Sequence, residues 1–146
     1  MACSRPGGAY GDFNNIDLVQ RKLTIAHPSA PGKPILVLHP KIAETAVSQQ
    51  RGLMGVHRMP AEAGMIFQFE TPIATGFYMK NTLIPLDIAF WGSNNRIVKI
   101  FHMVPCKADP CPIYAPGQTY VGALEANRGV LAKHGVAIGD RVVVEP

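Results

Sequence analysis

A chain of 146 residues has the usual size of one domain and can bury a core without metals or a set of disulfides. Hydrophobic residues make up 47%, which excludes wholesale disorder, and the 14 glycines and 13 prolines predict many turns and few long helices. The net charge is +4, but charged residues make up only 16% and the basic ones are scattered, so we expect no nucleic-acid binding. We also expect no membrane span and no intact signal peptide.

The N-terminal segment is expected to be a flexible lead-in over residues 1–15, followed by one β-rich domain over residues 16–146. Near its start a small residue, Ala2, directly precedes Cys3. One interpretation is a bacterial lipoprotein whose signal has been removed, so that a lipid on Cys3 would anchor the protein to a membrane. The other interpretation is a stray cysteine in a tail, and the sequence leaves both open.

The first half of the chain predicts three strands and one helix. Residues 18–27 show mixed alternation and residues 35–38 form a short apolar run between prolines, so both are predicted strands. Residues 44–54 place apolar side chains at helical spacing, which predicts a helix of about three turns that ends near Gly52. Residues 64–70 contain alternating large apolar side chains and are predicted to form a further strand.

The next stretch predicts a hairpin followed by an irregular loop. Residues 77–81 form a short predicted strand, and residues 86–91 form a strong one. Residues 92–95 are Gly and Asn-rich, which predicts a tight turn to a partner strand over 97–104. Residues 105–116 contain four prolines and two cysteines and are expected to lack regular structure.

The C-terminal part predicts two more strands around a short helix. The strands are expected over residues 120–124 and 141–144, and the helix over 127–134, closed by Gly135. Seven or more short strands with two short helices predict a mainly β fold, a compact antiparallel sandwich or barrel-like domain.

Cys106 and Cys111 are separated by four residues that include Asp109-Pro110. This spacing suits a looped disulfide and matches no common zinc or redox motif. Disulfides persist in oxidising compartments, so the pair predicts an exported protein of the periplasm or cell envelope. The lipoprotein-like start indicates the same location.

A carboxylate, Asp87, lies within the apolar run over residues 84–90 and is expected to be buried. An unpaired buried carboxylate costs several kcal/mol, so Asp87 requires a partner. Lys80, seven residues earlier, is the natural partner, and Arg51 and Arg128 are the alternatives.

The polar triplet Lys80-Asn81-Thr82 stands between apolar strands. It supplies several hydrogen-bond donors and acceptors close together, as a ligand site requires and as a structural turn also requires. Strict alternation would place Met79 and Asn81 on one face and Lys80 and Thr82 on the other. Two interpretations stay open: an ion pair that staples a β-turn to the core, or a ligand or catalytic site.

Other candidate residues flank this block. Arg51 and Met54 place a cation and a thioether where the first helix is expected to end, although packing alone could explain them. Glu125 ends a predicted strand and could either cap the next helix or face the polar cluster. Methionines such as Met79, together with His102, could hold a soft metal ion. Methionines more often fill cores, so we predict no metal site and no cofactor.

Several segments taken together resemble the domain-of-unknown-function family numbered 192. They are Arg51-Gly52-Leu53-Met54, residues 64–69, residues 77–87, Leu124-Glu125 and Gly139-Asp140, with the Cys106–Cys111 region between. The resemblance spans roughly residues 18–144 and implies a compact, mainly β fold found in bacteria and archaea, often behind a signal or membrane anchor. It implies no reaction.

Two departures from the family pattern stand out. Tyr78 stands where members often have Trp, which keeps an aromatic side chain. Val56 stands where many members have an arginine, so a charge has been lost unless Arg58 replaces it. The loss weakens the case for a charge-complementary ligand.

Three functional hypotheses remain. The leading one is an exported domain that binds a small polar or anionic ligand, or an envelope component, through Arg51, Met54, Met79, Lys80, Asn81, Asp87 and Glu125. The alternative is a hydrolase or lyase in which Asp87 or Glu125 is the general acid or base and Lys80 stabilises negative charge. The third is a structural or interaction protein with no small-molecule site. Because the chain has no P-loop, G-x-S-x-G or H-E-x-x-H motif, whether it is an enzyme stays open.

Overall fold

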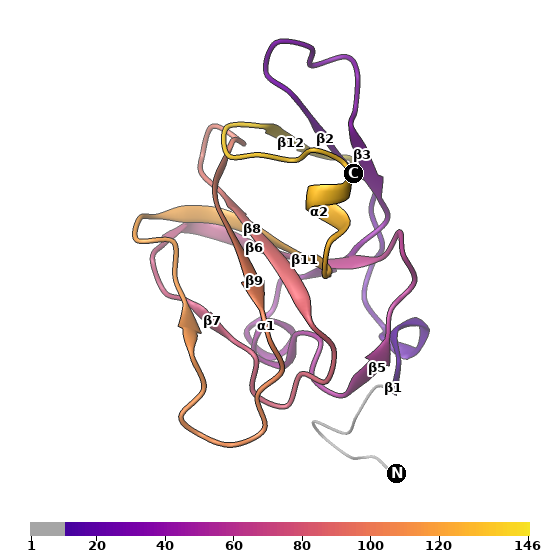
Figure 1. Ribbon diagram of the computed structural model, residues 1–146, viewed down its shortest axis with the longest axis vertical. Coiled ribbons are helices and arrows are strands. Elements are labelled where there is room, and N and C mark those ends of the chain that lie inside the picture. Colours follow the sequence, from indigo (N-terminus) through magenta and orange to yellow (C-terminus); the bar gives the residue numbers. More distant parts are fainter. Residues whose placement is uncertain (1–10) are drawn as a thin grey trace.

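The structure is a computed structural model and describes residues 11–146 (Figure 1). Cys3 lies outside the described residues. Residues 11–15, which we expected to be flexible, form strand β1 (Gly11–Asp12) and 3-10 helix η1 (Phe13–Asn15). They are ordered because Phe13 is buried in the core and because the Lys41 ammonium donates hydrogen bonds to two backbone carbonyls, those of Phe13 and Ile16.

A five-stranded sheet forms the centre of the molecule (Figure 1). Its strands, in spatial order, are β4 (Lys41–Ala43), β6 (Gly64–Ile73), β11 (Tyr120–Asn127), β8 (Leu86–Trp91) and β9 (Ile97–Met103). All neighbours are antiparallel except β4 and β6, which are parallel. The predicted hairpin joins β8 to β9, with Asn95 at a φ of 61° in its turn.

One face of this sheet is covered by a three-stranded sheet and a short helix. The covering sheet contains β12 (Arg141–Val144), β2 (Leu23–Ala26) and β3 (Leu36–Leu38), and the helix is α2 (Val130–Lys133). Alternate side chains of the central strands, such as Ile66, Leu124 and Ala126, pack with Ile25 and Leu38 into one core cluster. These two layers make a sandwich rather than a closed barrel.

The opposite face of the central sheet contributes to a second core cluster. Met65, Phe67 and Phe90 of the sheet pack there with Leu53 and Met79. The covering elements are helix α1 (Ala46–Arg51), strand β5 (Val56–Arg58) paired with β1, and strand β7 (Phe77–Tyr78) paired with β10 (Ile113–Tyr114). The mainly β prediction with two short helices is confirmed.

Both helices are shorter than predicted. Thr45 caps α1 and Gly52, at a φ of 51°, ends it, so the helix has six residues instead of three turns. Helix α2 has four residues because β11 continues to Asn127 and occupies the expected first turn. No helix among the described residues is long and apolar enough to cross a membrane.

The alternation predicted across residues 77–82 is wrong. Strand β7 ends at Tyr78, and Asn81 adopts a left-handed φ of 58°, which breaks the two-residue period of a strand. As a result Met79 and Thr82, expected on opposite faces, are both buried, whereas Asn81 is exposed. The predicted disulfide between Cys106 and Cys111 is present in the loop that follows β9.

Candidate functional site

The predicted ion pair between Lys80 and Asp87 is wrong. Lys80 forms an isolated bridge with Cys106, which brings its side chain to the disulfide loop. There its ammonium lies 2.8 Å from Asp109 Oδ2. The two side chains are 24% and 74% exposed, so this is a surface pair.

Asp87 is fully buried, as predicted, but other groups satisfy its carboxylate. Its Oδ1 lies 2.6 Å from His102 Nδ1, and its Oδ2 accepts a 2.8 Å hydrogen bond from the Gly129 backbone N–H. Arg128 is one of the two arginines that the sequence offered as alternative partners of Asp87, and its Nε lies 3.7 Å from Oδ1. The partners come from β9 and the β11–α2 turn, so Asp87 ties three segments together.

Glu125 and Asp87 lie on opposite faces of the central sheet. In the antiparallel register of β11 and β8, Asp87 stands beside Ala126, whereas Glu125 stands beside Ile88. Side chains of residues paired in this way point to the same face, and successive residues point to opposite faces. Asp87 therefore belongs to the face covered by the three-stranded sheet, and Glu125 belongs to the other.

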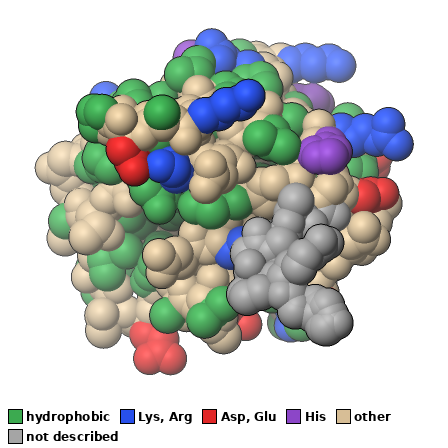
Figure 2. Space-filling view, turned by 90° about the horizontal axis from the view of Figure 1, so that it is seen from below, with side chains coloured by type: hydrophobic (Ala, Val, Ile, Leu, Met, Phe, Trp, Pro, Cys, Tyr) green, Lys and Arg blue, Asp and Glu red, His purple; other side chains and the backbone are tan. Residues whose placement is uncertain are grey.

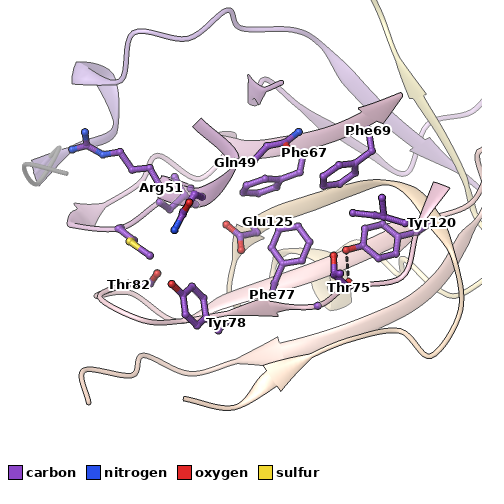
Figure 3. A pocket seen from close by; sticks show the side chains of 16 residues that line it. Gln49, Arg51, Phe67, Phe69, Thr75, Phe77, Tyr78, Thr82, Tyr120 and Glu125 are labelled. Atoms are coloured by element: carbon purple, nitrogen blue, oxygen red, sulfur yellow. Dashed lines mark hydrogen bonds between the residues drawn. The ribbon is translucent and has the colours of Figure 1, made fainter. Parts of the chain in front are cut away.

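A pocket of about 250 Å³ opens on the face that carries Glu125 (Figure 3). The end of helix α1, strand β6, the segment around β7 and strand β11 surround it. The lining residues are Gln49, Gln50, Arg51, Gly52, Leu53, Met54, Phe67, Phe69, Ile73, Thr75, Gly76, Phe77, Tyr78, Thr82, Tyr120 and Glu125. The pocket suits a small ligand with an apolar body.

The carboxyl group of Glu125 is the most unusual group in this pocket. The residue is only 4% exposed, and no described residue forms a hydrogen bond or an ion pair with its side chain. Its strand neighbours are apolar, Met65 on β6 and Ile88 on β8. Desolvation by burial therefore raises the pKa of Glu125 to about 8, and the group is mainly neutral at pH 7.

Aromatic side chains form one wall of the pocket and are held by mutual contacts. The ring centroids of Phe67 and Phe77 lie 4.8 Å apart in an edge-to-face arrangement, and those of Phe69 and Tyr120 lie 5.8 Å apart. The Tyr120 hydroxyl donates a hydrogen bond to the Thr75 carbonyl, which fixes the segment before β7 (Figure 3). These contacts give the wall a defined shape without a ligand.

Gly76 allows this wall to pack against the disulfide-bearing segment. A β-carbon at this position would lie 2.6 Å from Ile113 and 2.8 Å from the Tyr114 carbonyl oxygen. Both distances are far below van der Waals contact, so only glycine fits where β7 meets β10. Strand β10, which follows the disulfide, therefore packs directly against the pocket wall at Gly76.

A comparison with protein families shows to which family the chain belongs. A family model described as "Uncharacterized ACR, COG1430" matches residues 29–144. The chain belongs to this family, DUF192. The match covers the central sheet, strands β3 and β12 of the covering sheet and every pocket residue, and it begins after strand β2.

Two solved structures are similar to this DUF192 chain. A protein of unknown function from Novosphingobium aromaticivorans is 28% identical with a TM-score of 0.80, over 98% of this chain and 99% of that one. A protein described as a proposed transcription regulator from Sinorhizobium meliloti is 27% identical with a TM-score of 0.79, over 88% of this chain and 96% of that one. Comparison with curated proteins finds no match.

The residues predicted for a ligand site separate into two groups. Arg51, Met54 and Glu125 line the pocket of this DUF192 chain. The others lie elsewhere. Met79 is buried in the core, and Lys80 belongs to the surface pair with Asp109. Asn81 is exposed in the turn, and Asp87 is bonded to His102. Glu125 does not end its strand or cap a helix, because β11 continues for two residues beyond it.

Sequence reasoning missed the aromatic wall. The alternation of Phe67 and Phe69 within residues 64–70 places both rings on one face, which was the available signal. Phe77 and Tyr120 join that face only through tertiary packing. No group of three or more His, Cys, Asp or Glu side chains that could hold a metal ion occurs among residues 11–146.

Proposed function

We propose that this DUF192 chain is a binding domain for a small molecule and that its binding site is the pocket lined by Glu125. The apolar body of the ligand would pack against Phe67, Phe69 and Phe77. One polar group of the ligand would reach the Glu125 carboxyl. Burial of aromatic and aliphatic surface would supply most of the affinity, and the carboxyl would fix orientation.

One observation carries this proposal: Glu125 is buried, faces the pocket and has no hydrogen-bonding partner among the described residues. Its carboxyl oxygens are not among the sealed atoms that lack a partner, so they are open to the pocket, where a ligand can bond to them. The carboxylate of Asp87, which is equally buried, has partners in His102, the Gly129 N–H and Arg128. A ligand that bonds to Glu125 would recover part of the free energy that the free protein lacks.

The lining favours this binding role over the hydrolase or lyase that we considered from sequence. General acid and base catalysis by two carboxylates requires both to converge on one reacting group. Asp87 lies on the other face of the sheet, and Lys80 is paired with Asp109 outside the pocket. Glu125 alone can bind and orient a ligand.

The face of the molecule drawn in Figure 2 gives no support to a nucleic-acid role. In the view of Figure 2, Lys and Arg side chains are dispersed among hydrophobic and polar ones instead of forming a continuous patch. The description of the Sinorhizobium protein as a transcription regulator therefore stays with that protein.

Export remains part of the proposal. The disulfide between Cys106 and Cys111 supports it, because such bonds are rare in reducing compartments. Free-thiol counting on protein purified from its native compartment is expected to find both cysteines blocked. A reduced pair there would place the protein in a reducing compartment and contradict export.

The binding proposal can be tested by backbone NMR with a set of small aromatic fragments. Shift changes are expected to map to the pocket, at Gly52, Gly76 and Tyr78. Met54 lines the pocket, so the variant Met54→Trp would fill part of it and abolish these changes. Val47→Trp, on the exposed face of helix α1, is the matched control and should leave them intact.

Two outcomes would overturn the proposal. One is that no fragment shifts the pocket amides at millimolar concentration. The other is that fragments shift the amides equally in the protein and in Met54→Trp, which would place binding outside the pocket.

A further inference from the structure

We propose that the ligand of this pocket is an organic cation, a protonated amine attached to an aromatic or aliphatic body. This inference rests on the proposed binding function and names the chemical class that the site prefers. It follows from the charged groups that face Glu125, from the aromatic wall and from the absence of an internal partner among the described residues.

The groups that surround Glu125 leave it as the single acidic group of the pocket. Strands β6 and β8 place apolar Met65 and Ile88 beside it. The titratable groups from the other elements are the phenols of Tyr78 and Tyr120, and burial raises the pKa of Tyr120. The phenol of Tyr120 is therefore neutral near pH 7.

Arg51 is the other charged side chain that lines the pocket. Figure 3 shows its guanidinium end directed away from Glu125. The positive charge of Arg51 therefore does not occupy the place where a ligand ammonium would meet the carboxyl. Glu125 is therefore the ionisable group that selects the charge of the ligand.

The aromatic wall favours a positive charge at the same place. The face of an aromatic ring carries negative electrostatic potential, and ammonium groups bind to rings within about 6 Å. Phe67 and Phe77 flank the carboxyl of Glu125 in the pocket (Figure 3). A carboxylate beside aromatic rings attracts a desolvated cation and repels an anion.

Binding of a cation changes the protonation of Glu125. In the free protein the carboxyl is mainly protonated at pH 7, because burial raises its pKa to about 8. An arriving ammonium group stabilises the carboxylate, so the carboxyl proton leaves to the buffer and an ammonium–carboxylate pair forms. A neutral ligand would accept or donate a hydrogen bond and leave that proton in place.

Isothermal titration calorimetry with benzylamine, benzyl alcohol and benzoate tests this class directly. The three probes share a ring and differ in the charge of one substituent. At pH 7 benzylamine is expected to bind roughly tenfold more tightly than benzyl alcohol, and benzoate more weakly than either. Titrations in phosphate and in Tris, which differ in ionisation enthalpy, should show about one proton released per benzylamine and none per benzyl alcohol.

Two variants separate the role of charge from that of shape. Glu125→Gln keeps a polar side chain of similar size, so it should still bind benzyl alcohol but lose the preference for benzylamine and the proton release. Glu70→Gln removes an exposed acid on β6 outside the pocket and should retain both.

The outcomes distinguish this inference from the binding function on which it rests. If benzyl alcohol binds as well as benzylamine, with no proton released, the cation preference is wrong while the pocket remains a binding site. If none of the probes binds to the unmodified protein, the proposed binding function fails with it. Equal loss of preference in Glu125→Gln and Glu70→Gln would show that general surface charge, rather than Glu125, selects the cation.

Discussion

The two buried carboxyl groups of the central sheet differ in their partners rather than in their burial. Asp87 and Glu125 are 0% and 4% exposed and stand in adjacent cross-strand rows, on opposite faces. Asp87 is bonded to His102 and to the Gly129 N–H, whereas Glu125 faces a pocket with no bond from a described residue. The bonds of Asp87 hold the fold together, whereas the carboxyl of Glu125 is left open to a ligand in the pocket.

The largest expected effect that separates Glu125 from Asp87 is the pH dependence of the free energy of unfolding. The pKa of Glu125 is about 8 in the folded chain and about 4.5 when exposed, so between these values only the folded chain holds the proton. Rising pH therefore removes stability that is fully present below pH 4.5, by about 1.4 kcal/mol per pH unit and roughly 5 kcal/mol in all. Urea unfolding followed by Trp91 fluorescence, with Glu125→Gln as the reference, measures this difference.

A stability difference between the protein and Glu125→Gln that stays constant from pH 5 to pH 8 would contradict this expectation. It would mean that the Glu125 carboxyl is solvated or bonded in solution. The contrast with Asp87 would then disappear.

Removal of the bonded carboxylate is expected to have the next largest effect. Asp87→Ala leaves the Gly129 N–H without its acceptor and separates His102 from β8, so the free energy of unfolding should fall by about 3 kcal/mol. Asp109→Ala removes the carboxylate of the exposed Lys80 pair and serves as the matched control. If both variants lose the same amount, Asp87 is not the structural anchor proposed here.

The helix that borders the pocket depends on its N-terminal cap. Thr45 accepts a hydrogen bond from the Ser48 N–H, and the Ser48 side chain accepts one from the Thr45 N–H. Thr45→Ala should lower the free energy of unfolding by about 1 kcal/mol. Because α1 carries part of the pocket, the same variant should also weaken fragment binding at Gly52. Unchanged fragment binding would show that α1 is not needed to shape the pocket.

The smallest effect is expected at Lys80. Its pair with Asp109 is largely exposed, so Lys80→Ala should change stability by less than about 1 kcal/mol. A loss as large as that of Asp87→Ala would indicate that Lys80 does support the buried carboxylate in solution.

The sequence predicted the fold class because its signals are local. Mixed alternation located β2, apolar runs located β3 and β8, and turn residues located the hairpin from β8 to β9. The short strands β4, β5 and β10 were missed, because two or three residues carry no readable period.

The site was predicted only in part because its geometry is not local. The burial of Asp87 followed from its apolar neighbours, but its partner was misassigned because Asn81 and the disulfide loop turn Lys80 away. The pocket depends on strand register, which decides that Glu125 and Asp87 face opposite ways. A single sequence does not give that register, and so the two carboxylates were predicted to share one cluster.

The central claim is that Glu125 is a buried carboxyl without a partner among the described residues, and that a bound ligand cation converts it to the carboxylate. A carbon-13 NMR titration of the Glu125 carboxyl, with and without saturating benzylamine, tests it in one measurement. The account predicts a pKa near 8 in the free protein and a clear decrease when benzylamine is bound. A pKa near 4.5 in the free protein, or one that benzylamine leaves unchanged, would contradict it.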